Sequence, residues 1–417
     1  MATGNYLDRG QINNPRFYVD RGKYLQIKGF RHETYFSNDA DSLFDANSLQ
    51  TYGLSNSLVY KMTDLNPLTP VIFNTKDLDI PIKFCLWLGS ESNSSGDNLS
   101  NLRYLGILGH NFDSANCKIT FDILQSKHDI DGGDLSLTAS GNGILGANVP
   151  ASSILNWGAN SLDSYKPNDG TTIIDLDGTL TEHSMPNVSG NWFFNDNNAW
   201  GIVVTLEPAS SGVPFMENIN IGAFSYGSYY QMPFSPDMTS NFSVKNEGVK
   251  KQKTIGGATV TNTLYTGSPD WPVDTSNRDT RRPFSSHDIA RVERHEGRRV
   301  WDMNYTAMFD YELFSPNIDH SFSQVSDDFY SVVVSKTLSG QLPFIFEYNT
   351  NTISSSDYNT YDDTAGDTEY AGFGDNLQAS EHMPHHFCLA RFESNEFSAD
   401  QIAPGIWSFG LTIEETW

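Results

Sequence analysis

Three carboxylates lie close together on a glycine-containing loop, in the stretch "HDIDGGDL" from His128 to Leu135. Asp129, Asp131 and Asp134 supply the hard oxygen donors that Ca²⁺ prefers in proteins. The stretch lacks the full twelve-residue loop and the terminal Glu of a helix–loop–helix calcium site. Two interpretations stay open, a Ca²⁺ site on these three residues and an ordinary acidic turn.

Two further carboxylates, Asp175 and Asp177, lie in "TTIIDLDGTLTEH", Thr171 to His183. This stretch resembles the nucleophile motif of the haloacid-dehalogenase superfamily of phosphatases. The resemblance implies that Asp175 attacks phosphorus, that Asp177 acts as acid and base on the leaving group, and that Mg²⁺ is bound. It also implies a doubly wound α/β domain with Asp175 at the carboxyl end of a central parallel strand.

The residues after Leu180 do not fit that domain. They read "TEHSMPNVSGNWFFNDNNAWG", with a Pro, glycines and a run of Asn, and cannot form the crossover helix that parallel strands require. We therefore predict a strand in "TTIIDLDG", closed by a turn in which Asp177-Gly178 supplies positive φ angles. An Asp-nucleophile phosphatase is kept as the last alternative, and the chain is not expected to be an enzyme.

The histidines and cysteines do not form a zinc pattern. Three histidines and a Glu cluster in "EHMPHHF", Glu381 to Phe387, but Pro384 forbids the helix on which a His-Glu-x-x-His site is built. No C-x-x-C pair occurs among Cys85, Cys117 and Cys388. We expect these cysteines to be buried free thiols.

Composition favours an all-β protein. Charged residues make up only 18% of the 417 residues, while aromatic residues reach 13% and the 33 Gly and 18 Pro are spread along the chain. The net charge of −25 makes nucleic acid and anionic membranes poor partners. We see no run of about 20 apolar residues and no signal peptide, so we expect a soluble protein made in a cytoplasm.

Short β-branched and aromatic runs bounded by turn residues predict many strands. The fold class expected is all-β, with two antiparallel β-sandwich or jelly-roll domains, long polar loops and at most one or two short helices. The predicted strands include those in "PIKFCLWLG", "LRYLGILGHNF", "CKITFDIL", "NWFFND", "AWGIVVTLEP", "ENINIGAFSYG", "RRVWDMNYTAMF", "QLPFIFEYN", "HHFCLARFES" and "GIWSFGLTIEETW".

The expected organisation has three parts. Residues 1–50 form an extended arm and a hairpin, in which "RFYVDRGKYLQIKGF" gives a strand, a turn near Gly22 and a second strand. Residues 51–235 form one sandwich, and residues 236–417 form a second sandwich or barrel with an acidic loop at 350–384. A hairpin or meander is expected in "NFSVKNEGVKKQKTIGGATVTNTLYTG", and "DDFYSVVVSKTLSG" departs from the strand period and could form a short helix.

One basic stretch stands out in this acidic chain. A helix is predicted at "SSHDIARVERHEGRR", Ser285 to Arg299, with Asp288 in its first turn and arginines in its last. Two interpretations come first, a solvated helix face and a contact with an acidic neighbour such as another copy of the chain. Nucleic-acid binding is third, because no interleaved aromatic residues accompany the arginines. The arginines proposed for such a contact are Arg281, Arg282, Arg291, Arg294, Arg298 and Arg299.

Several phrases are similar to structural proteins of tailed phages. "NLRYLGILGHNFDSANCKITF", which contains His110-Asn111, and "ENINIGAFSYGSYYQMPFSPD" resemble paired strands of galactose-binding-like jelly rolls in those proteins, over about 51–235. "GRRVWDMNY", "VSKTLSGQLPFIFEYN" and the last strands resemble distal-tail and minor-tail proteins. The resemblance implies a β-domain that assembles as a ring at the tail tip. Distal-tail proteins usually carry the ring-forming barrel first, whereas here it would come last.

The expected function is that of a virion structural protein, a tail or tail-tip (baseplate) component that forms a homo-oligomeric ring. Its partners would be other copies of itself and other virion proteins. No cofactor is expected, apart from the Ca²⁺ that Asp129, Asp131 and Asp134 could bind. The alternative is a glycan-binding adhesin of the tail that recognises a host surface glycan, because jelly rolls are a common sugar-binding scaffold. Trp192, Trp200 and Tyr229 are its candidate stacking residues, although each also suits a buried core.

Overall fold

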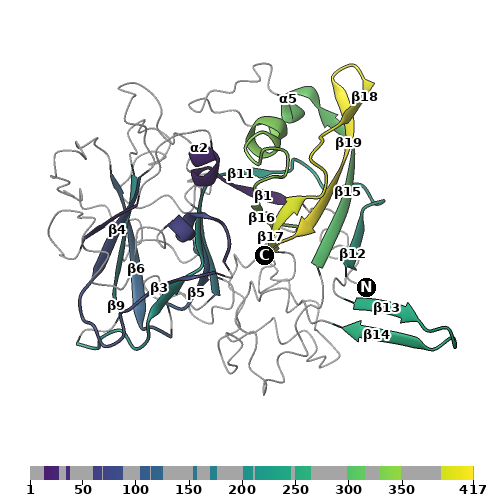
Figure 1. Cartoon of the computed structure of the whole chain (residues 1–417). Coiled ribbons are helices and arrows are strands. Elements are labelled where there is room, and N and C mark those ends of the chain that lie inside the picture. Colours follow the sequence, from purple (N-terminus) through teal and green to yellow (C-terminus); the bar gives the residue numbers. More distant parts are fainter. Residues whose placement is uncertain are drawn as a thin grey trace, which may run out of the picture.

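The computed structural model describes a protein built mainly of β-strands (Figure 1). It describes residues 14–27, 34–37, 60–67, 69–87, 104–112, 114–124, 154–156, 170–175, 201–209, 212–245, 249–263, 298–314, 328–348 and 387–416. Every strand pairing within these residues is antiparallel. The predicted all-β class is therefore confirmed.

The largest sheet in the described residues has eleven strands. Its order is β12 (Asn241–Lys245), β15 (Arg298–Phe309), β19 (Ile406–Glu415), β17 (Phe387–Phe392), β16 (Phe344–Glu347), β1 (Arg16–Asp20), β11 (Ala223–Gln231), β5 (Tyr104–His110), β8 (Gly170–Asp175) and β7 (Ile154–Asn156), with β18 (Ala399–Ala403) paired to β19. Because β1 lies between β16 and β11, the N-terminal strand joins strands from both of the larger predicted segments. The predicted boundary near residue 235 stays a prediction, and this sheet runs across it.

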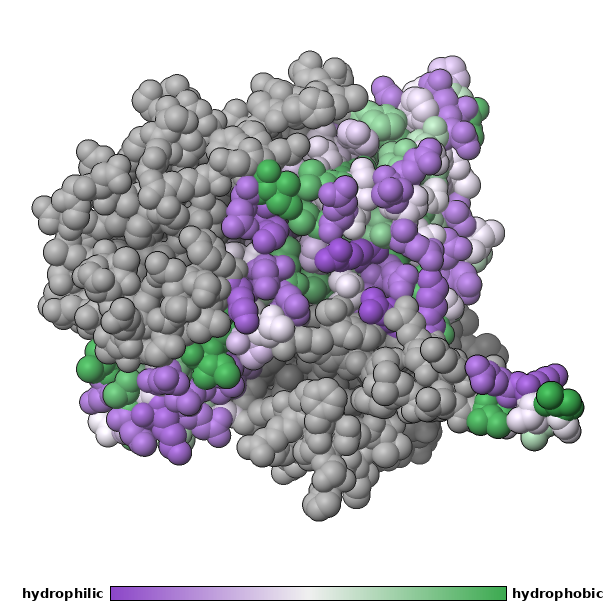
Figure 2. Space-filling model, viewed as in Figure 1, coloured by the Kyte–Doolittle hydropathy of each residue, from purple (hydrophilic) through white to green (hydrophobic). Residues whose placement is uncertain are grey.

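The remaining elements are smaller. A four-stranded sheet has the order β2 (Thr34–Ser37), β4 (Ile82–Trp87), β9 (Gly201–Pro208), β6 (Cys117–Leu124), and two strand pairs are β3 (Val71–Phe73) with β10 (Ile219–Ile221) and β13 (Val249–Lys253) with β14 (Thr259–Thr263). The helical segments are α2 (Gly22–Ile27), α5 (Asp310–Leu313), the 3₁₀ turn η2 (Tyr60–Thr63) and the π-helical turn η7 (Tyr330–Val334). Figures 1 and 2 show the β13–β14 pair projecting from the rest of the described molecule.

The N-terminal hairpin prediction was wrong in its second half. β1 forms as expected, but the chain then enters helix α2 instead of a second strand. The cause is local, because the Asp20 carboxylate accepts the backbone N–H of Lys23 at 2.7 Å and turns the chain into the helix. Gly22 suits this turn, since a Cβ there would lie 2.3 Å from the Tyr226 hydroxyl oxygen.

Two layers pack together in the segment around β5 and β11. Phe84 of β4 makes an edge-to-face contact with Phe224 of β11, with ring centroids 5.6 Å apart, and stacks with Phe73 of β3 at 6.3 Å. All three rings are fully buried. The four-stranded sheet thus covers one face of the long sheet, and each buried Phe contributes about 2–3 kcal/mol through its apolar area.

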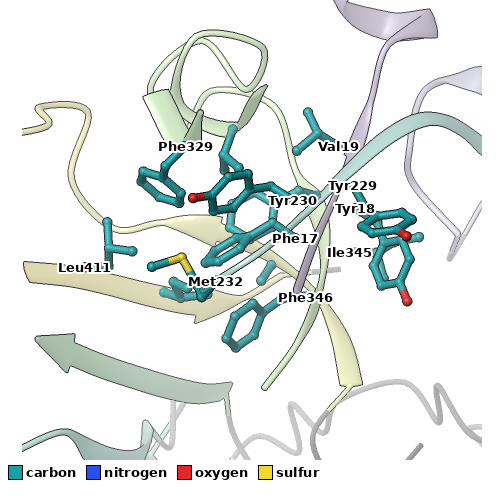
Figure 3. Close-up of a cluster of buried hydrophobic side chains, with 14 of the residues drawn as sticks. Phe17, Tyr18, Val19, Tyr229, Tyr230, Met232, Phe329, Ile345, Phe346 and Leu411 are labelled. Carbon is teal, nitrogen blue, oxygen red and sulfur yellow. The ribbon is translucent and has the colours of Figure 1, made fainter. Parts of the chain in front are cut away.

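A second core forms where β1 packs with residues of the C-terminal strands and of η7. Figure 3 shows Phe17 and Phe346 on one side of β1, with Phe329 beside them and Tyr18 on the opposite side. Phe17 lies 5.5 Å from Phe329 and 5.2 Å from Phe346, between ring centroids. Phe329 immediately precedes η7, so the short helix expected in "DDFYSVVVSKTLSG" is confirmed and covers the inner face of the sheet.

The predicted helix Ser285 to Arg299 is wrong at its C-terminal end. Arg298 and Arg299 are the first residues of the twelve-residue strand β15, and residues 285–297 lie outside the described residues. From Trp301 to Thr306 the strand alternates buried side chains with more exposed ones, which matches the period of two predicted for "RRVWDMNYTAMF", whereas Arg299, Val300 and Trp301 are all buried. Two of the six proposed contact arginines therefore belong to the sheet.

Candidate functional site

Many predicted site residues lie outside the described residues. These are Asp129, Asp131 and Asp134 of the proposed Ca²⁺ loop, Asp177, Trp192, Trp200, and the arginines Arg281, Arg282, Arg291 and Arg294. The acidic loop 350–384 and the histidine cluster up to His386 also lie there. Their roles stay predictions. The structure places Asp175, Tyr229, Arg298 and Arg299.

Tyr229 does not present a free ring to a sugar, so the glycan-stacking role proposed for it is corrected. It lies in β11 with 8% of its surface exposed, and the Arg16 guanidinium carbon lies 4.4 Å from its ring centroid. Arg16 also donates to Gln231 Oε1 at 2.8 Å and to the Tyr18 hydroxyl at 3.2 Å. Tyr18 in turn donates to Glu347 Oε2 at 3.1 Å, so Tyr229 belongs to a polar and aromatic network across the sheet.

Asp175 is the last residue of β8, and the predicted strand is confirmed. β8 pairs antiparallel with β5 on one side and with β7 on the other. The phosphatase motif needs its first Asp at the end of a parallel strand, so the strand environment of Asp175 does not suit a nucleophile.

His110 of β5 and Asp20 of β1 are among the titratable groups buried in the long sheet. His110 stacks on Phe112 with ring centroids 4.2 Å apart, and burial lowers its pKa to about 3. Burial raises the pKa of Asp20 to about 6, although the backbone N–H groups of Lys23 and Tyr226 partly oppose that shift. The neighbouring Asn111 accepts Asn220 N–H at 2.7 Å, so the His110-Asn111 pair holds the β5 end against β10.

Cys117 and Cys388 are buried free thiols, as predicted. Burial raises the pKa of both thiols well above the ordinary value, so they stay protonated near neutral pH. Cys85 lies in β4.

Arg299 is buried instead of exposed, which corrects its assignment as an assembly contact. Glu415 Oε1 accepts from Arg299 Nη2 at 2.8 Å, and Glu415 Oε2 accepts from Arg299 Nε at 3.0 Å and from its backbone N at 3.1 Å. The side chains are 2% and 0% exposed. Arg299 also lies over the Trp301 ring, with its guanidinium carbon 5.3 Å from the ring centroid. Removing one partner of such a buried ion pair costs about 3–5 kcal/mol.

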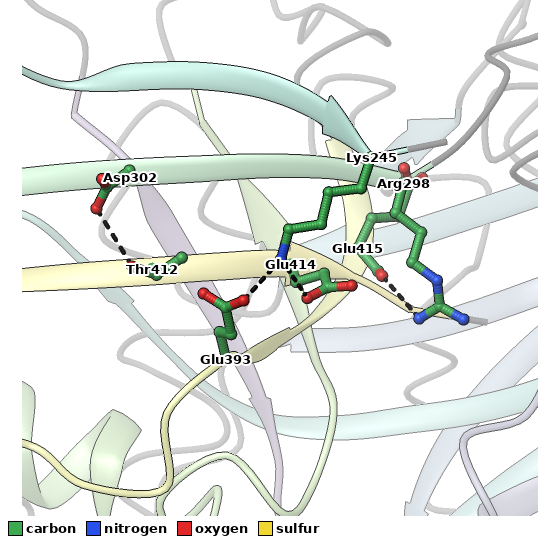
Figure 4. A network of polar contacts seen from close by, with 7 residues as sticks. All are labelled: Lys245, Arg298, Asp302, Glu393, Thr412, Glu414 and Glu415. Carbon is green, nitrogen blue, oxygen red and sulfur yellow. Dashed lines mark hydrogen bonds and ion pairs between the residues drawn. The ribbon is translucent and has the colours of Figure 1, made fainter. Parts of the chain in front are cut away.

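The outer face of the same strands carries an exposed ionic network (Figure 4). Lys245 of β12 contacts Glu393 at 2.6 Å and Glu414 of β19 at 3.2 Å, and its side chain is 41% exposed. Its hydrogen bond to Glu393 raises the pKa of Lys245. Arg298 donates to the Glu415 carbonyl oxygen at 3.3 Å, so this arginine also belongs to the sheet. These contacts fix β12 to β15 and β19.

β12 ends the long sheet on this side. In the described part of the chain, no strand pairs with its outer edge. Phe242 and Val244 of β12 are 55% and 43% exposed, although Phe242 packs against Trp301 with ring centroids 5.6 Å apart. An exposed, partly apolar edge strand is a template for pairing with another chain. The alternating run "NFSVK" predicts a strand, but it does not show that the strand is an edge.

One hollow lined by Phe392, Glu396, Phe397 and Leu411, among others, has a volume of about 40 Å³, which suits water and not a sugar. No group of three or more metal-ligating side chains occurs within the described ranges. No helix in them is long and apolar enough to cross a membrane.

Comparison with known proteins adds no family to these observations, because neither a family model nor a curated protein matches the chain.

Proposed function

We propose that this chain is a structural protein of a tailed-bacteriophage virion, a tail or tail-tip (baseplate) component that assembles with copies of itself into a ring. The order of the phrases similar to jelly-roll and distal-tail proteins supports the proposal, and so does the antiparallel all-β fold. The observation that carries it is the β12 edge with its exposed Phe242 and Val244.

The edge supports assembly on physical grounds. An edge strand of a long sheet leaves backbone N–H and C=O groups on its outer side, and proteins that stay monomeric protect such edges with charge, proline or a covering element. β12 instead carries two exposed apolar side chains, and the ion pairs of Lys245 hold it in place. A neighbouring copy that covers this edge would bury those side chains in a repeated contact.

The test is the oligomeric state of the full chain, measured by native mass spectrometry and sedimentation velocity. We expect a discrete oligomer for the wild type, closed rings in negative-stain images, and monomers for the double variant Phe242→Lys, Val244→Lys. Ile27→Lys is the matched control, because Ile27 is 51% exposed and lies in α2. All variants should keep the wild-type circular dichroism spectrum, since the substituted side chains are exposed.

A wild-type chain that stays monomeric at every concentration would contradict the proposed assembly. An antibody against the chain that fails to label the tails of particles carrying it would contradict the virion assignment.

A further inference from the structure

The β13–β14 hairpin is a regular element that stands apart from both sheets. Its five residue pairs run in register from Val249 opposite Thr263 to Lys253 opposite Thr259. The turn is closed by Thr254 N–H donating to the Ala258 carbonyl at 2.9 Å and Gly257 N–H donating to the Thr254 carbonyl at 2.9 Å. Gly257 has a φ of +81°, a conformation that glycine adopts without strain.

The outer part of the hairpin, residues 252–260, is open to solvent. Every residue from Gln252 to Val260 is exposed, including Ile255 at the turn (110%) and Val260 (55%). An isolated two-stranded hairpin is marginally stable in water, because two strands alone cannot bury an apolar face. The ordered hairpin with its apolar tip therefore suits a contact with another surface.

The charge of the hairpin indicates which surface it contacts. The fifteen residues 249–263 include Lys250, Lys251 and Lys253 and no acid, in a chain with 51 acids against 26 basic residues. The chain's other surfaces are on average strongly acidic, so a second copy offers a complementary partner. Nucleic acid would also attract lysines, but the net charge of −25 opposes its approach.

One acidic surface of the chain also carries exposed apolar side chains. It lies where the segment after β3 meets the segment before β10, since Asp77 N–H donates to the Phe215 carbonyl at 2.9 Å. Here the exposed Asp77, Asp79 and Glu217 stand with the exposed Ile80 (49%) and Met216 (57%), and the exposed Lys76 is the one cation among residues 76–80 and 215–217. In Figure 1, β3 and the hairpin lie on opposite sides of the molecule. We call the surface formed by Asp77, Asp79, Ile80, Met216 and Glu217 the acidic patch.

We propose that the β13–β14 hairpin is an assembly arm that docks on the acidic patch of a second copy of this chain. Its lysines would face Asp79 and Glu217, and Ile255 would contact Ile80 or Met216. Because arm and patch are different surfaces on opposite sides, the contact is head-to-tail, and it closes into a ring when the rotation between copies permits. The inference rests on the proposed homo-oligomer and names a contact that joins its copies.

The test is a charge exchange on the full chain, with sedimentation velocity as the readout. Lys250→Glu, Lys251→Glu, Lys253→Glu should raise the Kd between copies at least about 30-fold, and so should Asp79→Lys with Glu217→Lys. Combining the two sets should restore most of the affinity. Asp77 is left unchanged, because its φ of +67° tolerates Asp better than Lys. The exposed Lys61, changed to Glu, is the control away from the arm.

Each outcome of this experiment supports or contradicts the arm contact. Loss of assembly in both single-sided sets, with recovery in the combined set, supports the contact. If the wild type assembles and either set assembles equally well, or if the combined set fails to recover, the arm contact is wrong while the proposed function stands. A monomeric wild type contradicts the proposed function itself, and the arm contact with it.

Discussion

The two strand pairs outside the large sheets have the same topology and opposite surroundings. In the β3–β10 pair, alternate side chains are buried, and the exposed fractions of Val71, Phe73, Ile219 and Ile221 do not exceed 2%. In the β13–β14 pair, every side chain from Gln252 to Val260 is exposed. The first pair is part of a core, whereas the second is an arm.

The difference lies in side-chain chemistry and not in backbone pairing. "VIF" and "INI" place apolar residues at both ends of each strand, on the face that is buried. Burial of each of these side chains contributes about 2 kcal/mol. "VKKQK" and "TVTNT" offer lysines and threonines instead. The arm therefore gains little from its own chain, and its sequence suits a function in contact with a charged partner.

The largest difference between the two strand pairs is expected when one side chain in each is replaced by Ala. Phe73→Ala should lower the free energy of unfolding by about 3–5 kcal/mol, because a fully buried ring is replaced by a cavity. Val260→Ala should change it by less than about 0.5 kcal/mol. Urea unfolding followed by tryptophan fluorescence measures both, below the concentration at which copies associate. A cost above about 1 kcal/mol for Val260→Ala would show that the arm packs on its own chain.

A pH titration tests the buried part of the molecule separately from the arm, because Asp20 of β1 is buried and the arm carries no carboxylate. Since burial raises the pKa of Asp20 from 3.8 to about 6, the folded chain holds a proton between those pH values that the unfolded chain has released. The stability contributed by this group therefore falls by about 2 kcal/mol as pH rises from 4 to 6. Asp20→Asn removes that fall.

We expect the free energy of unfolding of Asp20→Asn to rise by about 2 kcal/mol relative to the wild type between pH 4 and pH 6, whatever its stability at one pH. The variant also loses one acceptor for the N–H groups of Lys23 and Tyr226, which lowers its stability at every pH. His110 titrates in the opposite direction, because its lowered pKa makes stability fall as pH drops below 6.5, and it is present in both proteins. Parallel pH profiles for the two proteins would contradict the assignment.

The same contrast explains what could be predicted from the sequence. Short apolar and aromatic runs predict β4, β5 and β19, and an alternating pattern predicts β15, because both patterns are local properties. α2 was missed because one contact, from Asp20 to the Lys23 N–H, decides the turn. The candidate site was predicted less well. Arg299 was counted as an exposed cation, but its partner Glu415 lies 116 residues further along the chain, and no local pattern shows that pairing.

The burial of Tyr229 could not be predicted from the local sequence either. The run "AFSYGSYYQ" is rich in aromatic residues, which suit either a sugar-binding surface or a core. β11 is paired on both sides, by β1 and β5, and its residues Ala223 to Tyr230 are all buried. Whether an aromatic ring is covered depends on which strands become neighbours in the sheet, and that is a long-range property.

The smallest expected effect tests the tip of the arm. Ile255→Ser should leave the free energy of unfolding unchanged within about 0.5 kcal/mol, because Ile255 is fully exposed. It should raise the Kd between copies about threefold to tenfold, since partial burial of an Ile at an interface contributes about 1 kcal/mol. Ile402→Ser is the matched control, because Ile402 is also exposed (57%) but lies in β18. Equal effects of the two substitutions on the Kd would mean that the hairpin tip makes no contact of its own. A drop in stability for Ile255→Ser alone would mean that the tip packs on its own chain, and the contrast between the two strand pairs would then be lost.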